Sequence, residues 1–212
     1  MQRFILLTIA IAICGILFAG SFIFWQDKFQ ASLVSPPTDD ITLLFVGDIM
    51  LGRGVEWQIR QHGNDWKLPF LKIADVLRNA DIVFGNLESV ISDKGENLGS
   101  IYSFRADPKT LEGFTFAGFD VLSVANNHSL DYGTEAFLDS LEHLKKAEIA
   151  YVGGGADKES AHSPVIKEIW GTKIGFLGYT NLGSPYWKAG EYTPGIAWVD
   201  EGALLEFQKD IR

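Results

Sequence analysis

The chain has 212 residues, of which 47% are hydrophobic and 21% charged, and its formal net charge at pH 7 is -9. That length and apolar content suffice for one sizeable buried core. The acidic balance argues against nucleic acid as a partner, because phosphate backbones are bound by clustered Lys and Arg, and it is compatible with a cation-binding site. The single cysteine, Cys14, excludes an intrachain disulfide and leaves the redox compartment open.

An uncharged apolar run opens the chain, from Phe4 to Trp25. As a helix it would be about 33 Å long, which matches roughly 30 Å of bilayer hydrocarbon. Phe24 and Trp25 fall at the end where aromatics favour the membrane interface, and Arg3 on the short side places the N-terminus in the cytoplasm. We therefore expect residues 1–28 to form a single-pass anchor in the cell membrane, with the domain outside the cytoplasm. A cleaved signal peptide is the alternative.

A polar connector follows the apolar run. Residues 29–40 contain Pro36 and Pro37, which stiffen a linker, so this segment is predicted to be a spacer between membrane and domain. The domain itself is predicted to comprise residues 41–212.

Short apolar runs alternate with helical periodicity along this domain, which predicts an α/β fold with a mostly parallel sheet. The first run is expected to be a strand buried on both faces, because it is continuously apolar. Strands are predicted at 41–46, 81–85, 120–125 and 149–152, and a hairpin at 164–170 and 173–177. Helices are predicted at 55–61, 69–79, after Asp107-Pro108, at 133–147 and at 201–211. Loops are predicted at 89–105, as a rim or lid, and at 179–199.

Polar clusters follow three successive strands. They consist of Asp48, then Asn86 with Glu88, then Asn127, His128 and Asp131. Because the carboxyl ends of parallel strands meet at one edge of a sheet, we expect the three clusters to share a site. Carboxylate, amide oxygen and imidazole are ligands that hard or borderline divalent cations accept. The alternative is three ordinary strand-to-helix turns, in which Asp48 only caps a turn or the next helix.

Several other residues have less specific interpretations. Arg53, close to the Asp48 turn, could face an anionic substrate or pair with a carboxylate. Gly153 to Gly155 lack the spacing of a phosphate-binding loop and are interpreted as a flexible turn. Surface positions are expected for the histidines outside any motif, which are His62, His143 and His162.

Three of these segments together resemble a known family. The segments GDIMLGR (47–53), GNLES (85–89) and ANNHSLDYG (125–133), with the later GGGAD (153–157), are similar to the bacterial poly-γ-glutamate capsule-synthesis family, called CapA or PGA_cap. The resemblance runs from about residue 41 to the end of the chain. It implies a fold similar to calcineurin-like metallophosphatases, in which a layered sheet core is flanked by helices.

The resemblance also implies roles for the polar residues. One or two divalent metal ions (Mn, Fe, Zn or Mg) would be held by Asp48, Asn86, Glu88 and Asn127. His128 and Asp131 would be the catalytic residues, with Asp131 orienting His128. Arg53 is the candidate substrate-binding residue because of its place near the Asp48 turn, and the resemblance itself assigns it no role. Two such cations can clamp the attacking and leaving oxygens of a phosphoryl transfer.

The sequence departs from the metallophosphatase pattern in three places. The second acidic motif of those enzymes has Asp where this chain has Asn86 or Glu88. Met50 stands where those enzymes carry a histidine, and no histidine follows His162. The domain is therefore expected to have an incomplete C-terminal half, and the hydrolase activity is left open.

The sequence thus favours a membrane-anchored factor for synthesis, export or anchoring of poly-γ-glutamate or a related anionic envelope polymer. Its expected partners are that polymer and other capsule-synthesis membrane proteins, with no nucleic acid. The alternatives are a metal-dependent phosphoesterase outside the membrane, acting on a phosphoester substrate, and a truncated or inactive family member.

Overall fold

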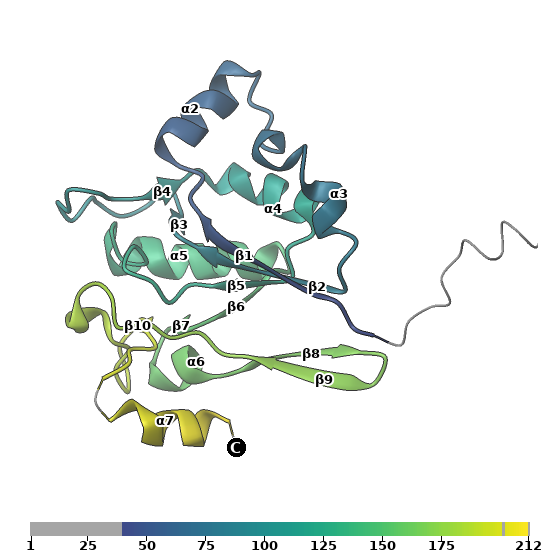
Figure 1. Ribbon diagram of the computed structural model, residues 1–212. Helices are drawn as coiled ribbons and strands as arrows, with labels where there is room; N and C mark the ends of the chain where they lie inside the picture. Colours follow the sequence, from purple (N-terminus) through teal and green to yellow (C-terminus); the bar gives the residue numbers. More distant parts are fainter. Residues whose placement is uncertain (1–39, 201, 212) are drawn as a thin grey trace, which may run out of the picture. The chain divides into compact units, whose positions relative to one another are not determined.

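A four-stranded parallel sheet organises the described part of the chain, which comprises residues 40–200 and 202–211 of a computed structural model (Figure 1). The strand order is β1-β2-β5-β6, and all neighbouring pairs are parallel. These strands are β1 (Leu43–Ile49), β2 (Ile82–Leu87), β5 (Val121–Ser123) and β6 (Ala150–Val152). The prediction of an α/β fold with a mostly parallel sheet is therefore confirmed.

The predicted membrane anchor and most of the predicted linker lie outside the described residues. Within residues 40–200 and 202–211, no helix has the length and apolar character needed to cross a membrane. The residues from Ile41 onward form one compact unit.

Helices cover one face of the sheet. They are α3 (Ala74–Leu77), α4 (Leu111–Ala117) and α5 (Gly133–Lys146). The main core cluster joins side chains of these helices to the residues of β2 and β5 that alternate onto this face, such as Val83 and Leu122. The helix predicted at 133–147 is confirmed as α5, and its Phe137 and Leu144 are fully buried in this core. Apolar burial on this face thus fixes the orientation of each strand.

A hairpin covers the opposite face. Strands β8 (Val165–Ile169) and β9 (Thr172–Phe176) pair antiparallel, as predicted, and lie on the other side of the sheet from α4 in Figure 1. A second core cluster joins Phe176 of β9 to Ile82 and Val121 of the sheet. The ring of Phe84 stacks on Phe176 with 5.6 Å between centroids. The polar ends of the sheet strands lie just beyond this cluster.

Shorter elements complete the fold. They are α2 (Arg53–Gln61), η1 (Leu68–Phe70), β3 (Val90–Ile91), β4 (Arg105–Ala106), η2 (Pro108–Thr110), β7 (Gly154–Gly155), α6 (Lys158–His162), η3 (Pro185–Trp187), β10 (Gly195–Ile196) and α7 (Ala203–Asp210).

Two expectations about these elements are wrong. The helix predicted over 69–79 is broken into η1 and the short α3, and the break lets Phe70 pack against two aromatic rings of the core. The predicted flexible turn at the three glycines is buried structure: Gly154 and Gly155 form β7, which pairs with β10 inside the predicted loop. A Cβ at Gly153 would lie 2.5 Å from Ala125, so close packing explains these glycines.

β1 is an edge strand, so the expectation that its run is buried on both faces is also wrong. Leu44 and Val46 pack into the helix-side core, whereas Leu43 and Phe45 on the other face are 37% and 60% exposed. Within the described residues no strand pairs with the outer edge of β1. Position in the sheet, which local composition does not encode, decides this burial.

β1 also contains a bulge opposite β2. The pairing register shifts between Phe45 and Asp48, so that Val46 and Gly47 together stand opposite the single residue Gly85. A bulge inserts one unpaired residue, and every side chain beyond it changes face.

The bulge decides which way Asp48 points. Leu44 and Val46 face the helix-side core, and strict alternation would turn Asp48 into that core as well. The extra residue instead brings Ile49 into the core, where it is 8% exposed, and leaves Asp48 outside. Asp48 is then aligned with Asn86 on the hairpin side of the sheet.

Substituting Gly85 with Ala should destabilise the fold. The new Cβ would lie 2.7 Å from Ile49 Cδ1 and 3.0 Å from Val46 Cγ2, beneath the bulge. Overpacking of this kind costs about 1–3 kcal/mol in the free energy of unfolding, which urea denaturation measures. Gly47→Ala is the matched control, because its new Cβ would have nothing within 4 Å. A Gly85→Ala chain as stable as Gly47→Ala would contradict the packing described for the bulge.

Candidate functional site

The polar ends of three strands lie side by side on the hairpin face of the sheet. Asp48 of β1 is aligned with Asn86 of β2, and Asn86 is aligned with Ser123 of β5. The predicted convergence is therefore observed for the first two clusters. Asp48 and Asn86 lie within the last residues of their strands, whereas the sequence predicted them in the loops that follow.

A pocket of about 420 Å³ opens beside this row. Four predicted ligand residues, Asp48, Asn86, Glu88 and Asn127, line it together with Phe84, Ser123, Ala125, Asn126 and the segment that follows β9, namely Leu177, Gly178, Tyr179, Thr180 and Leu182. The pocket is thus bounded by the strand ends on one side and by the chain after the hairpin on another. Arg53 lies outside this lining.

The amide of Asn86 joins the two carboxylates of the site. Its Nδ2 donates to Asp48 Oδ1 at 2.8 Å and to Glu88 Oε2 at 2.7 Å. Its Oδ1 accepts from Asn126 Nδ2 at 3.1 Å. In this orientation an N–H₂ group, with partial positive charge, lies between two acidic side chains. Asn86 therefore acts here as a donor that organises the carboxylates.

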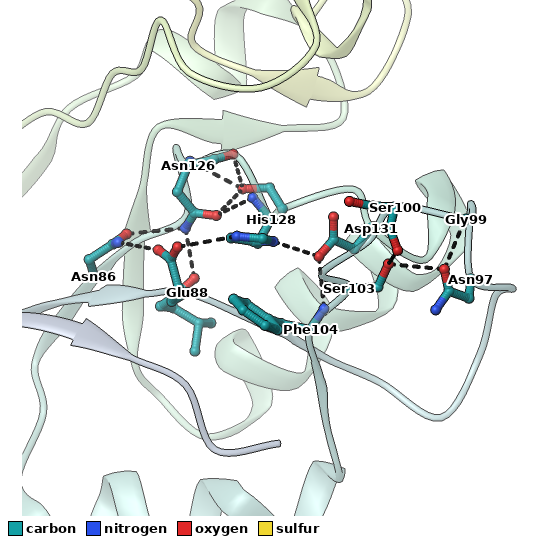
Figure 2. Close-up of polar contacts among 12 residues, drawn as sticks. Asn86, Glu88, Asn97, Gly99, Ser100, Ser103, Phe104, Asn126, His128 and Asp131 are labelled. Atoms are coloured by element: carbon teal, nitrogen blue, oxygen red, sulfur yellow. Dashed lines mark hydrogen bonds and ion pairs between the residues drawn. The ribbon is translucent and has the colours of Figure 1, made fainter. Parts of the chain in front are cut away.

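Asn126 is a central residue that the sequence analysis missed. It is 5% exposed, and its Nδ2 also donates to the carbonyl of Leu87 at 2.8 Å (Figure 2). Its Oδ1 accepts from the backbone N–H of His128 at 2.9 Å and from Ser129 Oγ at 3.2 Å. An Asn whose side chain bonds the backbone two residues on is an Asx turn, so the Asn-Asn-His-Ser sequence carried that signal.

His128 lies between two carboxylates, as Figure 2 shows. Its Nδ1 is 2.7 Å from Asp131 Oδ2, and its Nε2 is 3.6 Å from Glu88 Oε1. The side chains of His128, Asp131 and Glu88 are only 12%, 1% and 13% exposed. Because a carboxylate accepts the Nδ1 proton, the neutral imidazole presents the Nε2 lone pair towards Glu88. The 3.6 Å between Nε2 and Glu88 Oε1 is too long for a hydrogen bond but is within ion-pairing distance of a protonated imidazole.

The predicted rim loop is tied to the same aspartate. The backbone N–H of Phe104 donates to Asp131 Oδ2 at 2.8 Å, and that of Leu98 donates to the Asp131 carbonyl at 3.0 Å. The ring of Phe104 lies against the imidazole of His128, with 4.0 Å between centroids. Asp131 therefore holds both the imidazole and the loop between β3 and β4.

Arg53 begins α2 with a positive φ of 53° and is exposed. Its guanidinium lies 5.6 Å from the ring of Phe104 and 5.9 Å from that of Tyr102. Among the described residues it has no carboxylate within ion-pairing distance, so the predicted alternative of a carboxylate pair is not observed. Arg53 presents a cation at the rim, next to the ring that contacts His128.

Burial and charge make the pocket unfavourable for a second ionised carboxylate. Burial raises the pKa of Glu88, and the nearby charge of Asp48 raises it further, while His128 and the Asn86 amide act in the opposite direction. A site in which burial and a neighbouring carboxylate disfavour the ionised form of an acidic group is suited to binding a cation or to holding a proton.

The donor set suits an oxygen-preferring cation. Across residues 40–200 and 202–211, no three His, Cys, Asp or Glu side chains come close enough together to hold a metal ion by themselves. A cation would need the carboxylates of Asp48 and Glu88 together with the amide oxygen of Asn127. The oxygen of Asn86 here accepts from Asn126, so it would join these ligands only after rotation of its amide. All of these line the pocket. Such ligands favour Mg²⁺ or Mn²⁺ over thiolate- and imidazole-preferring metals.

The remaining histidines lie away from this pocket. His62 contacts the carbonyl of Gln58 on its own helix, and His143 lies 3.3 Å from Asp139. His162 was expected at the surface, and this is wrong because it is 8% exposed and contacts Asp210. Its partner is 48 residues further along the chain, which local sequence could not indicate.

Comparison with known proteins identifies relatives of the chain. A family model described as bacterial capsule synthesis protein PGA_cap matches residues 42–206. Capsule biosynthesis protein CapA of Bacillus anthracis is 30% identical over 172 residues, covering 79% of this chain and 41% of that protein. PGA biosynthesis protein CapA of Bacillus subtilis (strain 168) is 30% identical over 190 residues, covering 87% and 50%. A probable polyglutamine synthesis accessory protein of Mycobacterium tuberculosis is 26% identical over 209 residues, covering 82% and 55%. The chain spans about half the length of these curated relatives.

Glu88→Gln should stabilise the metal-free protein at neutral pH. A carboxyl group whose pKa is raised by folding contributes stability below its ordinary value of 4.5, and this contribution is lost as the pH rises through the raised pKa. Glutamine stays neutral and keeps an oxygen for Asn86 Nδ2. Urea unfolding in chelator should therefore show a stability gain near neutral pH that disappears below the ordinary carboxyl pKa. Glu168→Gln, at an exposed position, is the control, and an equal gain there would contradict the assignment.

Proposed function

The chain belongs to the bacterial capsule synthesis protein PGA_cap family, and from this premise we propose that it assists synthesis, export or anchoring of an anionic cell-envelope polymer. Poly-γ-glutamate or a closely related polycarboxylate is the proposed polymer, since the names of the curated relatives refer to capsule, PGA and polyglutamine. The observation that carries the proposal is the polar chain Asp48–Asn86–Glu88–His128–Asp131, whose first three members line one pocket.

A membrane location is part of this proposal. The supporting feature is the uncharged run from Phe4 to Trp25, with Arg3 on its short side. Residues 1–28 would anchor the protein in the cell membrane with the domain outside the cytoplasm. The growing polymer and other membrane proteins of capsule synthesis would be its partners there.

An acidic pocket that binds a polycarboxylate requires positive charge. A divalent cation held by Asp48 and Glu88, with the amide oxygen of Asn127 or, after rotation of its amide, of Asn86, would supply that charge to the polymer carboxylates. Arg53, which lies beside the loop between β3 and β4 and outside the pocket lining, is the protein's own contribution, because its guanidinium has no carboxylate partner within the described residues. Arginine matches carboxylate geometry through two parallel N–H donors.

His128 and Asp131 supply the proton chemistry of the site. Asp131 accepts from Nδ1 and fixes the ring, so proton transfer takes place at Nε2, on the side of Glu88. A base held in this way can take a proton from a substrate group or return it, as general acid–base catalysis requires. Phe104 covers one face of the imidazole and limits water access there.

A metal-dependent phosphoesterase outside the membrane is the second candidate, and the His128–Asp131 dyad is the observation that favours it. A general acid must be oriented near the leaving group, which Asp131 achieves for His128.

Hydrolysis of bis(p-nitrophenyl) phosphate in Mn²⁺ separates the two candidates. The proposed function predicts no turnover above the background of a His128→Ala chain, because a polymer-binding role needs no phosphoryl transfer. Turnover that depends on Mn²⁺ and is abolished by His128→Ala would replace the proposal with the phosphoesterase.

Asp48→Ala and His128→Ala should abolish cation binding or support of polymer production. Asp48 is one of two carboxylates beside the Asn86 amide, and His128 contacts the other, so either change disrupts the same polar chain. Calorimetric titration with Mn²⁺ and polymer yield in a complemented deletion strain measure the two effects. His62→Ala is the matched control, because this exposed histidine contacts the Gln58 carbonyl at the end of its own helix. Unchanged Mn²⁺ binding and polymer yield in both site variants would rule the proposal out.

A further inference from the structure

One wall of the pocket is formed by the chain that follows the hairpin. Residues 177–180 and Leu182 face the strand-end carboxylates across the pocket. This segment, which we call the pocket wall and define as residues 177–183, belongs to no helix and to no strand of a sheet. Its position therefore depends on contacts made by individual residues.

On one side the pocket wall is held by close packing. A Cβ at Gly183 would lie 3.1 Å from Asn127 Cα, and one at Gly178 would lie 3.1 Å from Ser123 Oγ. The backbone of Thr180 also pairs with the chain near Trp198. These contacts fix the wall against the strand ends but leave its outer side to be held from elsewhere.

On the outer side the wall is held by α7. Tyr179 of the wall donates its hydroxyl to Asp210 Oδ2 at 2.7 Å, and the same oxygen lies 2.8 Å from His162 Nδ1 of α6. The ring of Phe207 meets that of Tyr179 edge-on at 4.4 Å. A single carboxylate, 13% exposed, thus joins the pocket wall, α6 and α7.

In the described part of the chain, the imidazole of His162 makes one hydrogen bond, to Asp210, and its other nitrogen is left unsatisfied. His162 Nε2 is buried and has no hydrogen-bond partner among the described residues. A buried polar atom without a partner destabilises the folded state. The Nδ1 atom of His162, by contrast, bonds Asp210 and orients the carboxylate that accepts the hydrogen bond of the Tyr179 hydroxyl.

We infer that Asp210 is a positioning residue of the pocket: through Tyr179 it holds residues 177–183 at the distance from Asp48, Glu88 and Asn127 that the ligand requires. The inference rests on the proposed function only in taking this pocket as the binding site. Asp210 touches neither the carboxylates nor the imidazole of the site, so it acts on binding through the wall.

Hydrogen exchange of the pocket wall tests the link without any ligand. Tyr179→Phe and Asp210→Ala each remove the hydroxyl–carboxylate bond, whose net contribution corresponds to roughly a two- to tenfold change in an opening equilibrium. The amide exchange rate of residues 178–183 should rise by about that factor in both variants. In Asp210→Asn, which keeps an acceptor oxygen, the exchange rate should rise less. Tyr186→Phe, at a 96% exposed tyrosine nearby, is the control and should leave exchange unchanged.

Two exchange results would overturn the inference. Unchanged exchange over 178–183 in both Tyr179→Phe and Asp210→Ala would show that the bond does not hold the wall. An equal rise in the rim loop at 98–104, which Asp131 holds independently, would show general loosening.

Binding of Mn²⁺ and of poly-γ-glutamate then tests the consequence. The dissociation constant should be lowest for Tyr186→Phe, higher for Asp210→Asn and highest for Asp210→Ala. In each variant its fold increase over the wild type should not exceed the fold increase in amide exchange of residues 178–183. If Asp210→Ala binds Mn²⁺ and poly-γ-glutamate as tightly as the wild type does, the inference is overturned and the proposed function is left intact. Absence of binding by the wild type would count against the proposed function, and the exchange experiment would still decide the inference.

Discussion

The bulge in β1 is the constraint on which the site depends. An edge strand with apolar residues on one face would, by alternation, bury Asp48 in the core. One extra residue opposite Gly85 turns Ile49 inward and Asp48 outward, so a carboxylate emerges beside Asn86 without a charge entering the apolar layer. Burying that charge unpaired would cost far more than a local loss of ladder hydrogen bonds. The bulge thus converts an ordinary strand end into one side of an acidic pocket.

The polar network behind the pocket is continuous and nearly fully paired. Asn126 bonds Asn86 and the His128 backbone, and Asp131 bonds the imidazole and the rim loop. In a low-dielectric interior such connected groups orient one another, so the pocket geometry is a property of the whole network. The network reaches the pocket at the exposed Asp48 and at the largely buried Glu88, where an external cation or proton can enter. The raised pKa of Glu88 reflects the same excess of acidic groups.

Much of the architecture could be predicted from local patterns. Apolar runs ending in Gly47-Asp48 and in Gly85-Asn86 indicated strands, and parallel topology then predicted that their polar ends would meet. Long-range register could not be predicted, so the bulge and the exposure of Phe45 on the edge strand were missed. The Asx turn of Asn126 has a local signal, but its bonds to Asn86 and to the Leu87 carbonyl, about 40 residues away, have none. Residues paired across the fold, such as His162 with Asp210, have no local signal at all.

The central claim is that the ends of β1 and β2 and the turn after β5 form one cation-accepting pocket. The most direct test is an NMR titration of the protein with Mn²⁺, whose unpaired electrons broaden resonances of nearby nuclei. We expect selective broadening at Asp48, Asn86, Glu88 and Asn127, with His128 affected next. Broadening that is centred elsewhere, or that spreads evenly over the exposed acidic residues, would contradict a shared pocket.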